Sequence, residues 1–343
     1  MTLQIVRLDR WIDPCFDEMI QAHPGVKLSI IETDSPMQDN LALMARTDLY
    51  HTTASRGETP LHWHITPELL KSWPRLKVVS STGAGYDTID VQACTDAGVL
   101  VVNQSGANAD SVAEHALGMM LTLLHRISES DHVLRTYDRR VAVSRESLMG
   151  RELRGKTLGL VGIGEIGQRV ARLAKAFGVR VLATDPYLED AQVEQRGALR
   201  VPLAQLLAES DVISVHCPRN QETEYLFNAE LFQAMKPNSV FISTARGGIH
   251  DEQALYEALV SGHLSAAGVD VWDPEPPVQD HPLLTLPNVL ASFHTAGVTH
   301  EARHNVARLG AEQLLQICRG ETPPRMVNPE VLDRVMARFA SEA

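Results

Sequence analysis

Short apolar runs alternate with amphipathic segments along most of the chain. In the first third, strand-like runs cover residues 3–7, 26–31, 49–53, 76–80 and 99–103, and helical patterns lie between several of them. Alternating strands and helices are typical of a mostly parallel sheet, because parallel strands need long crossover connections. The pattern therefore predicts a small α/β unit over residues 1 to about 104.

An apolar helical segment over residues 116–124 comes next. Ser111 and Glu114 ahead of it have the spacing of a capping box, which makes Glu114 a helix cap rather than a catalyst. The segment is apolar on nearly all sides, so we expect a helix buried at a domain or subunit interface. His115 is then a packed helix residue rather than a ligand.

Residues 128–157 are polar and are expected to form a helix and a connection. The alternation then resumes, with strand-like runs ending near residues 161, 184, 215, 243, 269 and 292. Helical patterns cover residues 168–177, 203–208, 229–235, 251–261 and 301–318, ahead of a proline-containing tail. This series predicts further α/β structure with a parallel sheet.

A glycine-rich turn opens the second series. Gly162, Gly164 and Gly167 follow an apolar strand at the spacing of a dinucleotide-binding turn. The first glycine permits the turn, the second lets the backbone approach a pyrophosphate, and the third lets the helix lie close to the strand. Such turns also occur without a ligand, but the flanking strands and helix here favour a dinucleotide site.

An acidic residue at the end of the next strand indicates which dinucleotide is bound. Asp185 is placed to accept hydrogen bonds from the adenosine ribose hydroxyls. Its carboxylate repels a 2′-phosphate, and Pro186 and Tyr187 supply no neighbouring arginine to receive one. The sequence therefore predicts NAD rather than NADP.

Polar side chains follow three later strands of the same series. Arg246 follows one strand, Asp270 with Glu275 follows the next, and His294 follows the last. Ligands of open parallel sheets lie beyond the carboxyl ends of the strands, where these loops converge. Each residue alone could be structural, as a surface ion pair, a solvated acid or a hydrogen-bonded histidine. Their joint occurrence after a dinucleotide turn favours hydride transfer between NAD and a 2-hydroxy or 2-oxo acid.

The chemistry assigns a role to each of these residues. Arg246 is expected to hold the substrate carboxylate and polarise the keto oxygen, since a guanidinium stays charged at any working pH. His294 is expected to donate a proton to that oxygen as hydride arrives, and to remove the hydroxyl proton in the reverse direction. Glu275 is expected to favour the imidazolium form and to fix the ring's orientation.

Two loops in the first unit could also be functional. Residues 55–64 form a polar connection that is either a surface loop or a cover over a substrate, with Arg56 or Trp63 touching it. Thr82, Gly83, Ala84 and Gly85 follow an apolar strand and form either a tight turn or a cradle of N–H groups for an anion.

Composition narrows the possible partners. The net charge is −12, with 31 basic and 43 acidic residues and no basic cluster, which argues against nucleic acid and anionic membranes. We find no signal-peptide pattern and no apolar stretch long enough to cross a bilayer. Cys15, Cys94, Cys217 and Cys318 lack metal-ligand spacing, so we expect reduced thiols, no metal and a cytoplasmic location.

Taken together, these segments resemble the D-isomer-specific 2-hydroxyacid dehydrogenase family. The resemblance rests on the stretches at residues 155–167, 245–248, 268–276 and 294–297, and it extends over nearly the whole chain. It implies that Arg246, Glu275 and His294 are catalytic, that Asp270 contacts the carboxamide of NAD, and that the loop from Thr82 to Gly85, with Arg246, binds the substrate. The implied cofactor contacts are Gly162, Gly164, Glu165, Ile166, Gly167, Asp185, His216, Cys217, Pro218, Thr244, Ala245, Arg246, Asp270, His294 and Gly297.

The resemblance also implies how the domains are organised. A discontinuous substrate domain would comprise residues 1–104 and 299–343, and an NAD domain would comprise residues 105–298. Both would be Rossmann-like or flavodoxin-like, with parallel sheets and a cleft between them. The apolar helix after Asn108 would pack across a homodimer. Because the chain ends at Ala343, we expect no added regulatory domain of the kind found in longer phosphoglycerate dehydrogenases.

Some positions depart from the family pattern. Asp110 stands where relatives often carry a small or hydroxylic residue, and it either weakens cofactor binding or points away. Phe293 replaces a common proline, without an expected mechanistic effect. Residues 55–64 do not match the phosphate-binding pattern of phosphoglycerate dehydrogenases, which leaves the substrate open.

Two alternative functions remain at this point. One is oxidation of a small anion such as phosphite or formate. The other is an NAD-sensing binding protein, like the corepressors that share this fold, although the chain shows no long disordered arms or basic patches.

Overall fold

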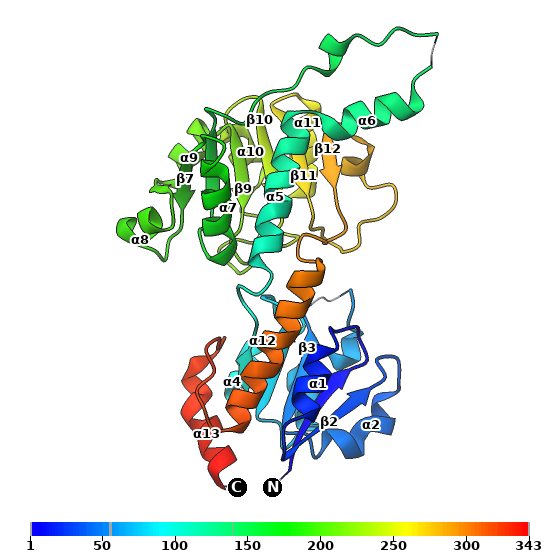
Figure 1. The fold of residues 1–343 in the computed structure, drawn as a ribbon, viewed down its shortest axis with the longest axis vertical. Helices are drawn as coiled ribbons and strands as arrows, with labels where there is room; N and C mark the ends of the chain where they lie inside the picture. The colour runs from blue at the N-terminus through cyan, green and yellow to red at the C-terminus, as the bar shows by residue number, and fades with distance from the viewer. Residues whose placement is uncertain (1, 55–56, 139, 342–343) are drawn as a thin grey trace. The chain divides into compact units, whose positions relative to one another are not determined.

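The computed structural model describes residues 2–54, 57–138 and 140–341 (Figure 1). The chain divides into two compact units. Unit 1 comprises Met1–Asn108 and Val298–Ala343, and unit 2 comprises Ala109–Gly297. The sequence-based boundaries, 104/105 and 298/299, fall beside these. Each unit is an α/β structure built on a parallel sheet, as the alternating pattern predicts.

The sheet of unit 1 has the strand order β2-β1-β3-β4-β5, and every pair in it is parallel. Its strands are β1 Leu3–Leu8, β2 Val26–Ile31, β3 Leu49–Thr53, β4 Val78–Thr82 and β5 Leu100–Val102. Its α-helices are α1 Cys15–Gln21, α2 Met37–Met44, α3 Pro67–Lys71, α4 Val91–Ala97, α12 His300–Cys318 and α13 Leu332–Ser341, and its 3-10 turns are η1 Leu61–Trp63 and η4 Pro329–Val331.

Alternating strand positions divide the core of unit 1 between the two faces of its sheet. Val6 and Val79 face a cluster that contains Trp63 and Trp73. The neighbouring strand positions face α1 and α12 in a second cluster around Phe16. This alternation follows from the two-residue period of a strand, which turns successive side chains to opposite faces.

The sheet of unit 2 has the order β12-β11-β10-β9-β6-β7-β8 and is also parallel throughout. Its strands are β6 Thr157–Val161, β7 Arg180–Thr184, β8 Leu199–Arg200, β9 Val212–Val215, β10 Ser239–Ser243, β11 Leu264–Val269 and β12 Val289–Ala291. Its α-helices are α5 Ala109–Leu124, α6 Ile127–Thr136, α7 Glu165–Lys175, α8 Asp190–Gln195, α9 Leu203–Glu209, α10 Ala229–Ala234 and α11 Glu252–Val260, and its 3-10 turns are η2 Arg145–Leu148 and η3 Pro282–Thr285.

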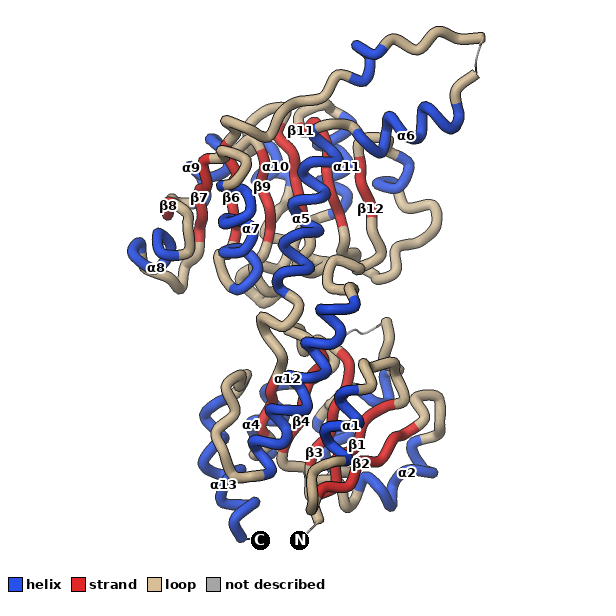
Figure 2. The backbone as a smooth tube through the Cα atoms, viewed as in Figure 1, coloured by secondary structure: helices blue, strands red, loops and turns tan. Residues whose placement is uncertain are grey.

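Helices cover both faces of this second sheet (Figure 2). One cluster joins α5 and α7 to one face of the sheet. Another joins α9, α10 and α11 to the opposite face. The strand order reverses between β6 and β9, which makes the carboxyl end of β6 a topological switch point, where α/β sheets bind ligands.

One expectation about a helix is wrong. The capping box at Ser111 does not form, because α5 already begins at Ala109 and the Ser111 hydroxyl donates to the carbonyl of Ala296, 2.6 Å away. Glu114 is exposed and lies within the helix. The proline-containing tail ends in α13, whose Val335 packs in the core of unit 1.

An arm extends from unit 2 between α5 and β6 (Figure 1). It contains α6, which has no buried residue, and η2. Its described apolar side chains are largely exposed, among them Leu134 and Met149, each 69% accessible. None of the helices that the structure describes has both the length and the apolar content needed to span a bilayer.

Candidate active site

The glycine turn leaves room for a ligand at one of its three glycines. A Cβ on Gly162, whose φ is +89°, would lie 2.8 Å from the backbone nitrogen of Cys217, and a Cβ on Gly167 would lie 2.4 Å from the Gly162 carbonyl. A Cβ on Gly164 would meet no heavy atom within 4 Å. The backbone at Gly164 is therefore open to an approaching pyrophosphate, at the N-terminus of the 11-residue helix α7.

Asp185 lies directly after β7 and contacts this turn. Its Oδ2 accepts a hydrogen bond from the Ile163 N–H at 3.2 Å, and its Oδ1 accepts one from the Tyr187 N–H at 3.1 Å. Sequence reasoning missed Arg196, which donates to the Ile163 carbonyl at 2.8 Å. A guanidinium therefore does lie beside the turn, although no motif connects Arg196 to it in the sequence.

The unusual acid at position 110 is paired. Asp110 Oδ1 accepts a hydrogen bond from Arg169 Nε of α7 at 2.9 Å, and Arg172 lies 3.5 Å away. Arg169 also contacts the carboxylate of Glu165 at 2.8 Å. Asp110 therefore points toward α7, and its charge is offset by neighbouring arginines.

Some polar atoms around the expected cofactor site have no hydrogen-bond partner among the described residues. His216 Nε2 is 2.9 Å from Ser214 Oγ, whereas its buried Nδ1 has no hydrogen-bond partner among the described residues. The buried Thr244 hydroxyl also lacks one there. Burial lowers the pKa of His216 to about 4 and raises that of the Cys217 thiol to about 11, so both are neutral near pH 7. A site lined by neutral groups and by polar atoms that lack described partners is better suited to bind an adenosine than to bind a charged group.

Arg246 lies in the turn after β10, next to Ala245. Its Nη1 donates to the Ala245 carbonyl at 2.8 Å. A Cβ on the following Gly247 would lie 1.9 Å from the Trp272 carbonyl, so this position accepts only glycine. The Arg246 turn is thus in direct backbone contact with the segment that leads to Glu275.

Asp270 is fully buried and holds the loop after β12. Its carboxylate accepts hydrogen bonds from the N–H groups of Thr295 at 2.9 Å and Ala296 at 3.0 Å. The Ser292 hydroxyl donates to the same carboxylate at 2.6 Å, and His115 Nε2 lies 3.1 Å from that hydroxyl. His115 therefore contacts the site network rather than only packing in α5.

His294 and Glu275 form the central pair of the site. His294 Nδ1 lies 2.7 Å from Glu275 Oε1, and both side chains are about one-third exposed. The backbone of His294 is left-handed, with a φ of 52°, and its N–H donates to the Asp270 carbonyl at 2.8 Å. Uncommon backbone conformations of this kind concentrate at functional sites.

A second acid and histidine support the segment before Glu275. The Glu252 carboxylate accepts a hydrogen bond from the Asp273 N–H at 2.9 Å and lies 2.8 Å from His281 Nε2. Burial raises the pKa of Glu252. Sequence reasoning missed this pair because its members lie 29 residues apart.

In the loop from Thr82 to Gly85 of unit 1, two N–H groups have no acceptor among the described residues. The Gly83 N–H donates a hydrogen bond to Oε1 of Gln104 at 2.8 Å. The N–H groups of Ala84 and Gly85 have no acceptor within the described residues, whereas the carbonyls of both are hydrogen-bonded. Backbone N–H groups without an acceptor are what an anion cradle offers.

A buried histidine fixes the start of this loop. His51 lies 3.1 Å from the Thr82 hydroxyl and 3.0 Å from that of Ser80. Burial lowers the pKa of His51 to about 3, so its ring stays neutral at ordinary pH. The side chain of Thr82 is thereby held in place without a charged group.

One of the two alternative substrate contacts expected from residues 55–64 is excluded by burial. Trp63 is fully buried and donates to the Thr33 carbonyl at 2.8 Å, so it belongs to the core of unit 1. A substrate contact through Trp63 is therefore wrong. Ser55 and Arg56 lie outside the described residues.

Comparison with known proteins agrees with this geometry. The model of the "D-isomer specific 2-hydroxyacid dehydrogenase, NAD binding domain" matches residues 117–296. A glyoxylate reductase of Korarchaeum cryptofilum is 38% identical over 268 residues, which are 78% of this chain and 81% of that protein. A D-3-phosphoglycerate dehydrogenase of Archaeoglobus fulgidus is 39% identical over 286 residues, 83% of this chain but 53% of the relative, so the chain spans about half of that protein.

Solved structures show the same fold over nearly the whole chain. The D-lactate dehydrogenase of Aquifex aeolicus, complexed with NAD and lactic acid, has a TM-score of 0.78 and 27% identity, and the match covers 94% of this chain and 98% of that one. An acyclic imino acid reductase in complex with NADPH and D-Arg has a TM-score of 0.82 and 26% identity, with 95% and 100% covered. The protein therefore belongs to the D-isomer specific 2-hydroxyacid dehydrogenase family of NAD-dependent oxidoreductases.

Proposed function

We propose that the enzyme interconverts a small D-2-hydroxy acid and its 2-oxo acid by hydride transfer with NAD. The observation that carries this proposal is the 2.7 Å contact between His294 and Glu275, beyond the strand ends of a dinucleotide-binding sheet. A carboxylate-oriented imidazole can give a proton to a keto oxygen or take one from a hydroxyl.

The residues divide the work of the reaction. NAD, when bound, supplies or accepts the hydride. Arg246 binds the substrate carboxylate and polarises the keto oxygen, and His294 transfers the proton at that oxygen. Glu275 orients the imidazole and favours its cationic form. In unit 1, the N–H groups of Ala84 and Gly85, which have no acceptor among the described residues, are proposed to bind a carboxylate of the substrate.

Unit 2 is proposed to hold the cofactor. Gly164 faces the pyrophosphate, Asp185 binds the adenosine ribose, and His216 and Thr244 offer the polar atoms that lack partners in the described structure. Asp270 holds the loop that carries His294 and is proposed to contact the carboxamide. NAD is favoured over NADP because Asp185 would repel a 2′-phosphate, although Arg196 lies beside the same turn.

We also propose a homodimer formed through the arm of unit 2. α6 has no buried residue, and six large apolar side chains of the arm are exposed. They are Ile127, Leu134, Tyr137, Val141, Val143 and Met149. Monomeric proteins rarely display so extended an apolar surface, which a second copy of the chain would cover.

The test is a panel of 2-oxo acids with NADH, followed at the nicotinamide absorbance. Glyoxylate, hydroxypyruvate, pyruvate, phenylpyruvate and branched 2-oxo acids are compared with acetaldehyde, which lacks the carboxylate. We expect turnover of at least one acid, none of acetaldehyde, and a D-configured product where the product is chiral. NADH binding without turnover of any acid would favour an NAD-sensing protein and overturn the proposal. Activity on phosphite or formate with NAD alone would overturn it in favour of anion oxidation.

A further inference from the structure

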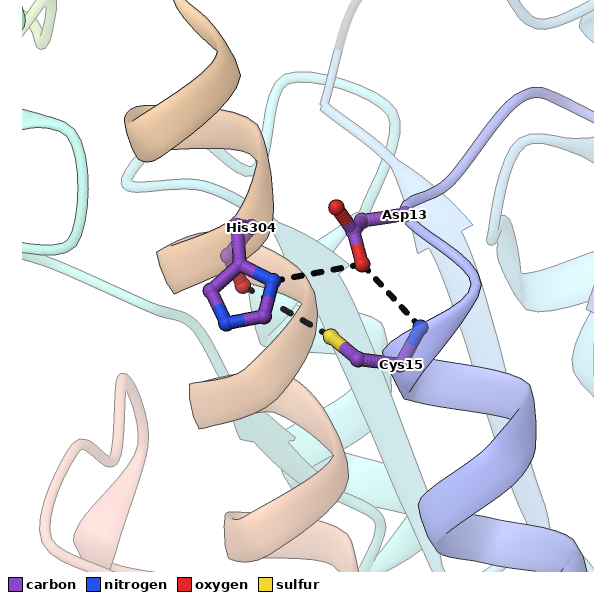
Figure 3. A group of neighbouring side chains, drawn as sticks. All are labelled: Asp13, Cys15 and His304. Carbon is purple, nitrogen blue, oxygen red and sulfur yellow. Dashed lines mark hydrogen bonds and ion pairs between the residues drawn. The ribbon is translucent and has the colours of Figure 1, made fainter.

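Three side chains of unit 1 to which no role is assigned above form a mixed metal-ligand set (Figure 3). They are Asp13, Cys15 and His304, and one potential ligand atom from each lies within 4.8 Å of the others. Among the described residues, these are the His, Cys, Asp or Glu side chains that form a group of at least three close enough together to hold one ion. Nothing in the proposed reaction uses it.

The surrounding structure holds these ligands in place. Asp13 Oδ1 accepts a hydrogen bond from the Cys15 N–H at 3.0 Å and lies 3.3 Å from His304 Nδ1. Cys15 is the first residue of α1, and His304 lies in the second turn of α12. The two helices pack together in one core cluster, so Cys15 and His304 come from packed helices, and Asp13 lies just ahead of α1.

We propose that Asp13, Cys15 and His304 bind one Zn²⁺ or a similar borderline divalent cation, with a water molecule as the fourth ligand. Zinc binds sulfur at about 2.3 Å and nitrogen or oxygen at about 2.0–2.2 Å in a tetrahedron, which places neighbouring ligand atoms roughly 3.3–3.7 Å apart. The 3.3 Å between His304 Nδ1 and Asp13 Oδ1 already meets this requirement. The Cys15 sulfur lies within 4.8 Å of the other two ligand atoms, so a movement of the thiol toward them completes the set.

The ligand types select the class of cation. A thiolate and an imidazole favour Zn²⁺ and other borderline metals, whereas Mg²⁺ and Ca²⁺ prefer sites made wholly of oxygen. One thiolate and one carboxylate also balance a charge of +2. Binding forms a sulfur–metal bond and releases the thiol proton to solvent, with no change in oxidation state.

A nucleophilic role for the thiol is disfavoured. Burial, reinforced by Asp13, raises the pKa of Cys15 to about 12, so without a cation the sulfur keeps its proton. The sulfur lies 3.9 Å from the carbonyl oxygen of His304.

The cation would act as a clamp within unit 1. It would tie the second turn of α12 to the segment that precedes α1. α12 is the first helix after the chain returns to unit 1 at Val298. We therefore expect the cation to stabilise unit 1 rather than to take part in hydride transfer.

Metal titration of the full-length protein tests this site. The protein is stripped with EDTA and titrated with Co²⁺, whose thiolate charge-transfer absorption reports sulfur coordination, and with Zn²⁺ in competition. We expect one ion per chain, a higher melting temperature with Zn²⁺, and no response to Mg²⁺. Cys15→Ser should abolish the charge-transfer band, and His304→Gln should weaken binding at least about tenfold, since loss of even an outer-shell partner costs 10–100-fold.

Matched controls lie on the same helix. Cys318→Ser and His300→Gln change the same residue types on α12 outside the cluster, and both variants should bind Co²⁺ like the parent. Absence of the thiolate band in the parent protein would overturn the proposal. So would binding that is equally strong in the Cys15→Ser and His304→Gln variants, which would indicate surface histidines. Because these readouts do not involve turnover, they are independent of the proposed function.

Discussion

The imidazole of His294 and the carboxylate of Glu275 meet at 2.7 Å, although they belong to loops that follow different strands. Asp270 positions His294 for this contact, because its carbonyl and carboxylate accept hydrogen bonds from the backbone N–H groups of residues 294–296. The ring is therefore fixed at its backbone and at Nδ1, which leaves Nε2 as the nitrogen for proton transfer. This arrangement leads to the first two predictions.

Replacing the histidine should remove the proton donor and keep the cofactor site. We expect His294→Gln to lower kcat by about 10²–10⁴-fold, the usual contribution of a positioned acid–base group. NADH affinity, measured by fluorescence titration, should change less than about twofold. The control is His125→Gln, an exposed histidine of unit 2, which should keep full activity. Near-normal kcat in His294→Gln would show that another group transfers the proton.

Replacing the glutamate tests orientation and charge together. Glu275→Gln keeps a hydrogen-bonding group at the same reach but cannot stabilise a cationic imidazole. We expect kcat to fall by about 10–100-fold, because acid–base catalysis contributes about 10²–10⁴-fold in total and part of it survives. NADH affinity should again be unchanged. Asp280→Asn, an exposed acid in the same segment, is the control, and an equal loss in both variants would refute a specific role for Glu275.

Cofactor preference should depend on Asp185. We expect Asp185→Ala to shift the ratio of kcat/KM for NADH and NADPH at least about tenfold toward NADPH, since a charge repulsion of about 1–4 kcal/mol disappears. Adding Arg196→Gln to this variant should reverse part of the gain if Arg196 receives the 2′-phosphate. A parent enzyme that already prefers NADPH would contradict this interpretation of Asp185.

Much of this site could be predicted from local sequence. The strands, the glycine turn and the residues at the strand ends depend on periodicity and on motifs a few residues long. The errors concern side chains with distant partners. Ser111 has capping-box spacing, but its hydroxyl bonds to Ala296, 185 residues away. Trp63 lies in a polar loop, but it fills the core.

Side-chain pairs that belong to no sequence motif were also not predicted, because their members lie far apart in the sequence. Asp110 meets Arg169 across 59 residues, and Asp13 meets His304 across 291. Spacing in the sequence carries no information on such pairs, because they depend on how helices pack. A metal-ligand set divided between two helices at opposite ends of the chain is therefore invisible to a search for local cysteine and histidine patterns.

The arm of unit 2 should control assembly. Light scattering should give twice the chain mass of 37.7 kDa for the parent protein. Leu134→Glu with Met149→Glu should yield a monomer, because charges would be buried in an apolar interface. Leu199→Glu changes an exposed leucine elsewhere in unit 2 and should leave the dimer intact. A monomeric parent would refute the proposed homodimer.

A buried ion pair should control the stability of unit 1. Lys77 Nζ lies 2.7 Å from Asp48 Oδ1, and both side chains are almost completely buried. Lys77→Met leaves the Asp48 charge without its closest cation, so we expect a loss of about 3–5 kcal/mol in denaturant unfolding. Adding Asp48→Asn to the Lys77→Met variant should restore part of the lost unfolding free energy. A loss below about 1 kcal/mol in Lys77→Met would contradict the prediction.

The same pair predicts how stability depends on pH. Burial alone would raise the pKa of Asp48, but hydrogen bonds from the Gln4 N–H, Lys77 and Arg75 outweigh it and hold the pKa below its usual value. A carboxyl with a depressed pKa stabilises the fold above the unfolded-state value of about 3.9 and loses that contribution as the pH falls through its folded pKa. Asp48→Asn should therefore flatten the acid side of the stability profile. An unchanged acid side would show that other carboxyls dominate.

The contact between Gly247 and the Trp272 carbonyl leaves no space for even one additional carbon atom. The backbone of the turn that carries Arg246 and the backbone of the segment that carries Glu275 therefore have complementary shapes, and each depends on the other. If only one of these segments were exchanged for the corresponding stretch of a relative, in order to redesign selectivity, the introduced backbone would be shaped to pack against a different neighbouring segment. Chimeras of this enzyme should therefore transplant both stretches together.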